Sequence, residues 1–424
     1  MNHHGPTEVL AIGGGPANLS LAALAQPLGE LRVTTVESRS SVAWHPGLLW
    51  SSSRLQVSSV KDLVSLVDPR SRFSFLNYLH EQGRLYRHLT AGAGQVSRKE
   101  FDQYFTWAAQ LLGVRLGEEV RAVEHHGDRF LIRTSRGTHH ADHLVLGVGQ
   151  TPWLPDCARG LAGPRLWHAA EHLTQDTPLT GRNILLVGGG QSAAEVALDL
   201  LSGRSGMPRR LTWVTGRHGF APLDDSPFAN EWFNPRYVEY FRTLPPGPRS
   251  ALLDQQRSAG TGITRELLTQ VYRRLYELDY LTDTPLHHEL LAGVRLEELT
   301  QDHEGFRAGL LDTVTGDRRP CHSDIVILAT GYRPQLPSCM APLHHRMPLD
   351  GDGYAVAADY RVPWDGPDGN RIHVQNAARP THGIADPNLG LAAWRAAVIL
   401  NSLLGREHYE LKADEITLGT GGRP

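Results

Sequence analysis

Two glycine-rich segments, each lying between an apolar run and a helical pattern, constrain the fold more than any other feature of this chain. They are Gly13-Gly14-Gly15-Pro16-Ala17-Asn18, after the apolar run 9–12, and Gly188-Gly189-Gly190-Gln191-Ser192-Ala193, after the apolar run 184–187. Glycine lets the backbone approach a pyrophosphate, and the N-terminus of the following helix supplies N–H groups and a positive dipole. One such segment is weak evidence, but two with the correct flanks predict a flavin and a nicotinamide dinucleotide.

The residue that ends the next strand distinguishes the two segments. The predicted strand 31–37 ends at Glu37, and an acid there binds the ribose 2′-OH and repels a 2′-phosphate, which favours FAD. The predicted strand 211–215 is followed by Arg217, a residue type that accommodates the 2′-phosphate of NADPH. The alternatives are a solvated carboxylate for Glu37 and a surface-loop arginine for Arg217.

The order of segments predicts an α/β fold with two Rossmann-like dinucleotide-binding domains and a small, mostly helical inserted substrate lobe. A β-meander is expected over 118–134, and helices are expected near 17–27, 73–83 and 99–113. The expected domains are FAD-binding, 1–175 and 327–424; NADPH-binding, 176–218 and 291–326; and the helical insertion, 219–290.

Two later segments are expected to return to the nucleotide sites. Ala329-Thr330-Gly331 follows an apolar strand and should bring the backbone back against the cofactors. Asp386-Pro387 is a typical helix start, so we expect a helix over about 388–404 whose N-terminus faces the flavin.

Composition excludes several other classes of protein. A net charge of −3 gives no basic surface for nucleic acid. The three cysteines are far apart and form no CxxC, which argues against a disulfide framework, a zinc site and a dithiol enzyme. The 22 histidines are scattered without metal-site spacing, so no metal is expected. The first strand begins near residue 8 and no apolar run reaches about 18 residues, so we expect a cytoplasmic protein without a signal peptide or membrane contact.

Five stretches together resemble the flavin-dependent N-hydroxylating monooxygenases of siderophore biosynthesis. They are 13–21, 55–68 with 73–79, 188–195, 224–233, and 324–332 with 382–394. This family contains lysine N6-hydroxylases, ornithine N5-hydroxylases and diamine N-hydroxylases. The resemblance covers nearly the whole chain, and Asn18, where many flavoproteins have a third glycine, is itself typical of the family.

The resemblance implies a reaction that the cofactors carry. NADPH reduces FAD, the reduced flavin and O₂ give a C4a-hydroperoxide, and a neutral primary amine takes the distal oxygen to become a hydroxylamine. The protein orients the amine and excludes water, so no catalytic side chain is assigned. The implied partners are a small primary amine, O₂ and further copies of the chain, as a homodimer or homotetramer.

The resemblance also implies roles for individual residues. Lys61 matches the lysine that holds the carboxylate of an amino-acid substrate, Asn230 matches an asparagine that binds the substrate, and Gln56 should contact the flavin. Together with the glycine motifs, it assigns the cofactors to Gly13, Gly15, Pro16, Ala17, Asn18, Glu37, Trp44, His45, Gln56, Gly188, Gly190, Gln191, Ser192, Arg217, Thr330, Gly331, Asp386, Pro387 and Leu389. The alternatives are a core residue for Trp44, a solvated charge for Lys61 and an Asx-turn for Asn230.

The expected substrate is L-lysine, hydroxylated at N6. The stretch 260–264 replaces a further asparagine of ornithine hydroxylases, and Gly390 stands where some members have serine, so L-ornithine is disfavoured. Lys61 would stabilise an α-carboxylate and repel a diamine. Cadaverine, putrescine and 1,3-diaminopropane remain alternatives. A ketone- or sulfur-oxygenating enzyme, a disulfide reductase and a non-catalytic flavin-binding module are the other classes that two nucleotide loops allow.

Overall fold

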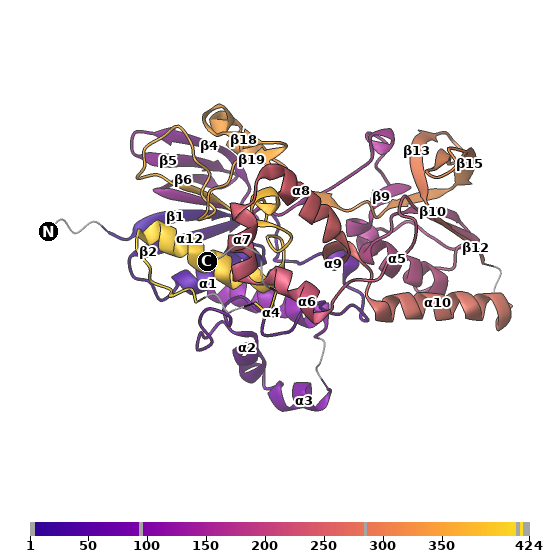
Figure 1. Cartoon of the computed structure of the whole chain (residues 1–424), viewed down its shortest axis with the longest axis horizontal. Helices are drawn as coiled ribbons and strands as arrows, with labels where there is room; N and C mark the ends of the chain where they lie inside the picture. Colours follow the sequence, from indigo (N-terminus) through magenta and orange to yellow (C-terminus); the bar gives the residue numbers. More distant parts are fainter. Residues whose placement is uncertain (1–4, 93–95, 284–285, 413–415, 419–424) are drawn as a thin grey trace.

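Two five-stranded parallel sheets organise the protein (Figure 1). The computed structural model describes residues 5–92, 96–283, 286–412 and 416–418. The first sheet has the order β20-β7-β1-β2-β3, with β1 (Thr7–Ile12), β2 (Leu31–Glu37), β3 (Arg115–Leu116), β7 (His143–Leu146) and β20 (Ile372–Val374). The second has the order β12-β11-β10-β16-β9, with β9 (Leu166–His168), β10 (Asn183–Val187), β11 (Arg210–Thr215), β12 (His287–Ala292) and β16 (Ile325–Leu328).

The strand that precedes each glycine segment is the central strand of its sheet. β1 lies between β2 and β7, and β10 lies between β11 and β16, with parallel pairing throughout. Both central strands are apolar on both faces because helices cover the sheets. The predicted α/β class with two Rossmann-like domains is therefore confirmed.

A three-stranded antiparallel sheet accompanies each parallel sheet. One contains β4 (Val120–His126), β5 (Arg129–Thr134) and β6 (Gly137–Ala141), as the predicted meander required. The other contains β13 (Val294–Gln301), β14 (Phe306–Asp312) and β15 (Arg318–Ser323). The short pairs are β8 (Thr151–Pro152) with β17 (Tyr332–Arg333), and β18 (Leu349–Asp350) with β19 (Gly353–Tyr354).

Some helices pack on the two sheets, and α6, α7, α8 and α9, within residues 227–261, lie between the sheets in Figure 1. α1 (Pro16–Ala25), α4 (Arg98–Leu111) and α12 (Ala392–Leu404) share one apolar core with the first sheet. α5 (Gln191–Ser202) and α10 (Arg265–Tyr280) share a core with the second sheet. The remaining helices are α2 (Phe75–Glu81), α3 (Leu85–Thr90), α6 (Pro227–Asn230), α7 (Pro235–Thr243), α8 (Pro246–Gln255), α9 (Arg257–Thr261) and α11 (Arg379–His382).

The sheets differ from the expected domain ranges at three places. β9 lies inside the range 1–175 but pairs with β16 in the second sheet. The limits at 290 and 326 fall inside β12 and β16, which both belong to the second sheet. A strand of only three residues, such as β9, is too short for a hydrophobic pattern that would predict its neighbouring strand, so the sequence could not reveal this pairing.

The predicted helix over about 388–404 is present, but Asp386-Pro387 does not cap it. α12 begins at Ala392, after a 3₁₀ turn over Leu389–Leu391. Asn388 caps that turn, because its Oδ1 accepts a hydrogen bond of 2.7 Å from the Gly390 N–H. The carboxylate of Asp386 does not act as a cap, since it pairs with an arginine further along the chain.

That pairing is the end of a buried polar chain that runs back to the first glycine segment. Asn18 accepts a hydrogen bond of 2.7 Å from Gln375, and Gln375 accepts one of 3.2 Å from Arg395 Nε. Arg395 Nη1 donates to the carbonyl and to the carboxylate of Asp386, whose other oxygen accepts from the Ala378 N–H at 2.9 Å. Arg395 and Asp386 are each 1% exposed, so the C-terminal segment is fixed to β1 through the interior.

Replacing Asp386 by alanine would leave the Arg395 guanidinium buried without its carboxylate. We expect D386A to lower the free energy of unfolding by about 3–5 kcal/mol, measured by urea denaturation. Asp156→Ala is the matched control, because Asp156 and Arg159 form an aspartate–arginine pair that is exposed. Similar small losses in both variants would contradict a stabilising role for the buried pair.

Buried histidines predict a pH dependence of stability. Burial lowers the pKa of His373 to about 3 and the pKa values of His143, His168 and His382 to about 4. The unfolded chain binds these protons near pH 6.5, so the free energy of unfolding should fall as the pH drops from about 7 toward 4.5. Each such histidine contributes up to about 1.4 kcal/mol per pH unit in that window.

The pH slope can be assigned with one substitution. His382→Gln should reduce the slope of unfolding free energy against pH by up to one proton, measured by urea titrations at several pH values. His303→Gln is the control, because His303 is 90% exposed. An unchanged slope in the His382 variant would show that this histidine is protonated equally in both states.

Candidate active site

The first glycine segment leaves open space at its third glycine. A Cβ added to Gly13 would lie 2.4 Å from the Gly147 carbonyl oxygen, and one added to Gly14 would lie 2.9 Å from Glu37 Cβ. A Cβ on Gly15 would meet no atom within 4 Å. The first two glycines therefore allow close packing against β7 and β2, whereas the third leaves room for a ligand to reach the backbone.

The second segment repeats this arrangement. A Cβ on Gly188 would lie 2.2 Å from the Ala329 carbonyl oxygen, and one on Gly189 would lie 2.2 Å from Thr215 Oγ1. Gly190 has only the Thr261 carbonyl oxygen nearby, at 3.5 Å from such a Cβ. The contact with Ala329 confirms that the segment after β16 returns to the second glycine loop.

The helices that follow the two segments begin without a side-chain cap. Gly15 and Gly190 occupy the N-cap positions of α1 and α5, and neither helix has a capping hydrogen bond from a side chain. Side chains cap α2, α4, α6 and α7, and the other described helices also lack such a cap, but only α1 and α5 among them begin at a glycine. Unpaired N–H groups and the positive end of the helix dipole are the features that bind a phosphate. Both loops therefore fit a dinucleotide pyrophosphate.

Glu37 reaches the first loop from the end of β2. Its Oε2 accepts a hydrogen bond of 2.7 Å from the Gly14 N–H, and its Oε1 accepts one of 2.9 Å from the Arg39 N–H. Burial alone would raise the pKa of Glu37, but these bonds and the Arg39 charge outweigh it and lower the pKa. An ionised acceptor thus lies at the glycine loop, as a ribose-binding acid requires.

Arg217 connects the second loop to the inserted helices. Its Nη1 donates to the Gly189 carbonyl at 3.1 Å and to the Thr261 carbonyl at 2.9 Å, and its Nη2 donates to Thr261 Oγ1 at 3.1 Å. Burial and the positive charge of Arg257 lower the pKa of Arg217, and the same causes lower the pKa of Arg379. An anionic group between these guanidinium groups would relieve their repulsion.

A row of rings joins the two halves of the protein. Trp44 lies 5.6 Å from His45, His45 lies 5.8 Å from Tyr332, and Tyr332 lies 5.1 Å from His168, measured between ring centroids. Burial raises the pKa of Tyr332 to about 12 and lowers that of His168 to about 4, so both rings are neutral near pH 7. Within the described residues, Tyr332 Oη and His168 Nε2 are buried without a hydrogen-bond partner.

Lys61 places a half-buried ammonium group beside the segment that precedes α12. A Cβ added to Gly390 would lie 2.8 Å from Lys61 Cδ, so the lysine stem occupies the space that this glycine leaves. Burial lowers the pKa of Lys61. No ion pair or side-chain hydrogen bond of Lys61 occurs in the part of the chain that the structure describes. Such an ammonium group favours an anionic partner.

Asn230 and Gln56 are both exposed. Asn230 Nδ2 donates to the Asp225 carbonyl at 2.9 Å, so in this structure its side chain is hydrogen-bonded within the segment 225–230. The neighbouring Ala229 packs against Ile384. The substrate lobe and Lys61 therefore both border the segment 384–390, although no contact joins Asn230 to Lys61.

Several other predicted cofactor residues make internal contacts. Asn18 Nδ2 donates to the carbonyls of Ile12 and Gly13 at 3.0 and 2.9 Å. Thr330 Oγ1 donates to the Trp153 carbonyl, and Gly331 has a positive φ of 88°. These residues shape the loops, while Ser192, Pro16 and Ala17 lie at the helix starts.

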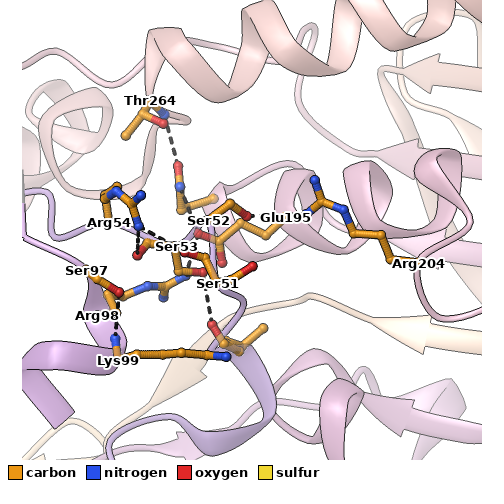
Figure 2. Close-up of polar contacts among 12 residues, drawn as sticks. Ser51, Ser52, Ser53, Arg54, Ser97, Arg98, Lys99, Glu195, Arg204 and Thr264 are labelled. Carbon is orange, nitrogen blue, oxygen red and sulfur yellow. Dashed lines mark hydrogen bonds and ion pairs between the residues drawn. The ribbon is translucent and has the colours of Figure 1, made fainter. Parts of the chain in front are cut away.

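One pair of charged residues at the junction between the two halves was not anticipated from the sequence (Figure 2). Arg98 Nη2 lies 2.5 Å from Glu195 Oε1. Glu195 also accepts from Gln191 Nε2 at 3.1 Å, and Gln191 Oε1 accepts from the Thr264 N–H at 2.9 Å. The available signal was the presence of two carboxylates, Glu195 and Asp199, among the apolar residues of α5, since a buried charge there requires a partner.

Three absences apply to the described residues only. No helix there is long and apolar enough to cross a membrane. No group of three metal-binding side chains occurs there. Cys157, Cys321 and Cys339 are free thiols.

Comparison with known proteins places these features in a family. A family model described as L-lysine 6-monooxygenase/L-ornithine 5-monooxygenase matches residues 6–334. The L-lysine N6-monooxygenase of Escherichia coli is 37% identical over 411 residues, which cover 95% of this chain and 96% of that protein.

Two solved structures contain the expected cofactors. A cadaverine monooxygenase of desferrioxamine biosynthesis from Erwinia amylovora, bound to FAD, is 30% identical with a TM-score of 0.91, covering 99% of this chain and 100% of that one. An ornithine N-hydroxylase from Kutzneria sp. 744, with reduced FAD, NADP⁺ and L-ornithine, is 27% identical with a TM-score of 0.85, covering 94% of this chain and 99% of that one. FAD and NADPH are therefore the cofactors of this protein.

We propose that Arg217 selects NADPH over NADH by binding the 2′-phosphate. Arg217→Gln should raise the KM for NADPH by about 10- to 100-fold and leave the KM for NADH unchanged, measured by nucleotide oxidation. Arg210→Gln is the control, because Arg210 is exposed at the start of β11, the strand that leads to Arg217. Equal effects on both nucleotides would contradict a role in phosphate binding.

Proposed function

Since this chain belongs to the L-lysine 6-monooxygenase/L-ornithine 5-monooxygenase family, we propose that it hydroxylates the N6 amine of L-lysine for the synthesis of a hydroxamate siderophore. The family reaction is flavin-dependent N-hydroxylation of a primary amine. The choice of L-lysine among the amines that this family hydroxylates is inferred from the residues of this chain.

The half-buried ammonium group of Lys61 is the observation that carries the proposal. It lies against Gly390 and lacks a protein carboxylate among the described residues. An α-carboxylate would supply the missing negative charge, whereas a second amine would be repelled. The 37% identity to the Escherichia coli lysine enzyme also favours L-lysine as the substrate.

The residues of this chain orient and shield the amine rather than react with it. Bound FAD, reduced by NADPH, supplies the activated oxygen. We infer that Lys61 holds the carboxylate end of the substrate, and that Asn230 exchanges the Asp225 carbonyl for the substrate when the lobe closes. The row of rings from Trp44 to His168 provides aromatic surface at the junction, and His45 within it is exposed.

A terminal diamine is the second candidate. The cadaverine monooxygenase from Erwinia amylovora superposes with a TM-score of 0.91 over 99% of this chain. A diamine would require Lys61 to turn toward solvent, because two ammonium groups of like charge would otherwise meet. We therefore rank cadaverine after L-lysine.

The test is hydroxylamine formation from a panel of amines. The purified protein would be supplied with FAD, NADPH and O₂ and with L-lysine, L-ornithine, cadaverine, putrescine or 1,3-diaminopropane, and NADPH use would be recorded in parallel. We expect product from L-lysine above all others. Product from cadaverine alone would overturn the substrate, and NADPH consumption that yields only H₂O₂ with every amine would overturn the amine class.

Lys61→Met keeps an unbranched side chain that is one atom shorter and removes its charge. We expect the KM for L-lysine to rise by about 10- to 100-fold while turnover of cadaverine is retained or improved, measured by hydroxylamine formation. Gly390→Ala is the matched variant, because the added Cβ would displace Lys61 without removing its charge. An unchanged KM for L-lysine in the Lys61 variant would exclude its role in carboxylate binding.

A further inference from the structure

We infer that Arg98 and Glu195 are a positioning pair that fixes the second glycine loop relative to the flavin-binding half, and so sets the rate at which NADPH reduces FAD. This inference rests on the proposed function only through the use of these two cofactors. Neither residue is assigned to contact a cofactor or substrate.

The pair joins the two halves directly. Arg98 is the first residue of α4, whose Phe101, Tyr104 and Phe105 lie in the core of the first sheet. Glu195 lies one turn into α5, the helix that begins at the second glycine loop. Their side chains are 14% and 9% exposed, so solvent screens the attraction only weakly.

Each member of the pair is held by its own neighbours. The Arg98 N–H donates to the Ser53 carbonyl at 3.0 Å, and Nη2 donates to Ser53 Oγ at 2.8 Å. Ser53 lies three residues before Gln56, at the start of the segment that leads to Lys61. Rotation of the Arg98 side chain would therefore disturb the approach to the flavin side of the site.

On the other side, Glu195 is tied to the inserted helices. Gln191 donates to Glu195 and accepts from the Thr264 N–H, and Thr261 in the preceding α9 accepts from Arg217. Figure 2 shows Ser53, Arg98, Glu195 and Thr264 converging at this junction. The ion pair thus lies on a path of hydrogen bonds that runs from Ser53 to Thr264, and the chain from Thr264 back to Thr261 continues this path to Arg217.

The pair is not optimised for stability alone. Among the described residues, Glu195 Oε2 and Arg98 Nε are buried without hydrogen-bond partners. Glu195 lines a cavity of about 50 Å³ together with Trp50, Ser53 and Thr264. Replacing a buried ion pair by apolar residues is often neutral or stabilising, so an incompletely satisfied pair is better explained by the orientation that it specifies.

The rate of hydride transfer from NADPH to FAD depends on how the two cofactors are oriented relative to each other. A displacement of about 1 Å between reacting groups can reduce a rate by about 100-fold. The pair joins α5, the helix of the second loop, to the first residue of α4. Its loss would let the two cofactor sites shift relative to each other while the glycines of both loops keep their packing.

The experiment measures flavin reduction under anaerobic conditions without any amine. Glu195→Gln keeps the shape and removes the charge, Glu195→Ala removes the contact, and Arg98→Lys keeps the charge without the planar fork. We expect the reduction rate at saturating NADPH to fall at least about tenfold in Glu195→Ala and less in the two conservative variants. The dissociation constant of NADP⁺ and the FAD content should stay within about threefold of the parent protein. Arg98→Ala should slow reduction as Glu195→Ala does. The double variant R98A/E195A should reduce no more slowly than the slower of these two single variants, because all three remove the same contact.

The control is Glu297→Gln, which breaks the pair between Glu297 and Arg318 inside the antiparallel sheet of the second half, 2.7 Å apart. It should leave the reduction rate unchanged. A normal reduction rate in Glu195→Ala, with only a lower melting temperature, would overturn the inference, as would a loss explained wholly by weaker NADP⁺ binding. If the parent protein is reduced by NADPH but hydroxylates no amine, only the proposed function fails.

Discussion

The buried contact between Arg395 and Asp386 is the interaction on which the arrangement of the first cofactor site depends. It connects α12, the segment 384–390 and, through Gln375 and Asn18, the first glycine loop. The last part of the chain thereby contributes both an edge strand of the first sheet and the surface that meets Lys61. A buried charge without a partner is costly, so any slippage of the C-terminal segment that broke this pair would be strongly opposed.

The two halves use the same architecture for different ligands. In both, a central strand leads to three glycines, of which the first two pack against neighbouring strands and the third faces open space. The difference lies at the end of the adjacent strand, where Glu37 supplies a carboxylate and Arg217 a guanidinium group. We therefore propose that the residue at the end of the adjacent strand sets which nucleotide each half binds, whereas the common loop binds the pyrophosphate that both nucleotides share.

Local features of the sequence predicted the glycine loops, their helices and the acid–base contrast between Glu37 and Arg217, because strand, turn and helix follow one another within about 30 residues. Features that depend on distant partners were not predictable in the same way. The sequence pattern around Asp386 predicts a helix cap, but in the structure its carboxylate pairs with Arg395. Arg98 and Glu195 are 97 positions apart, and β9 is too short to indicate that it pairs with β16. The site residues therefore followed from motif and resemblance, and the contacts between the halves from the structure alone.

The absence of side-chain caps at α1 and α5 makes the stability of the folded protein depend on bound nucleotides. Each helix leaves backbone N–H groups that a pyrophosphate would satisfy, so the bound cofactor would stabilise the folded state. By mass action, the fraction of chains that are folded then rises with the free concentration of the nucleotide. We expect the amount of folded protein to fall with the supply of flavin, so riboflavin limitation would lower the abundance of the protein as well as its activity.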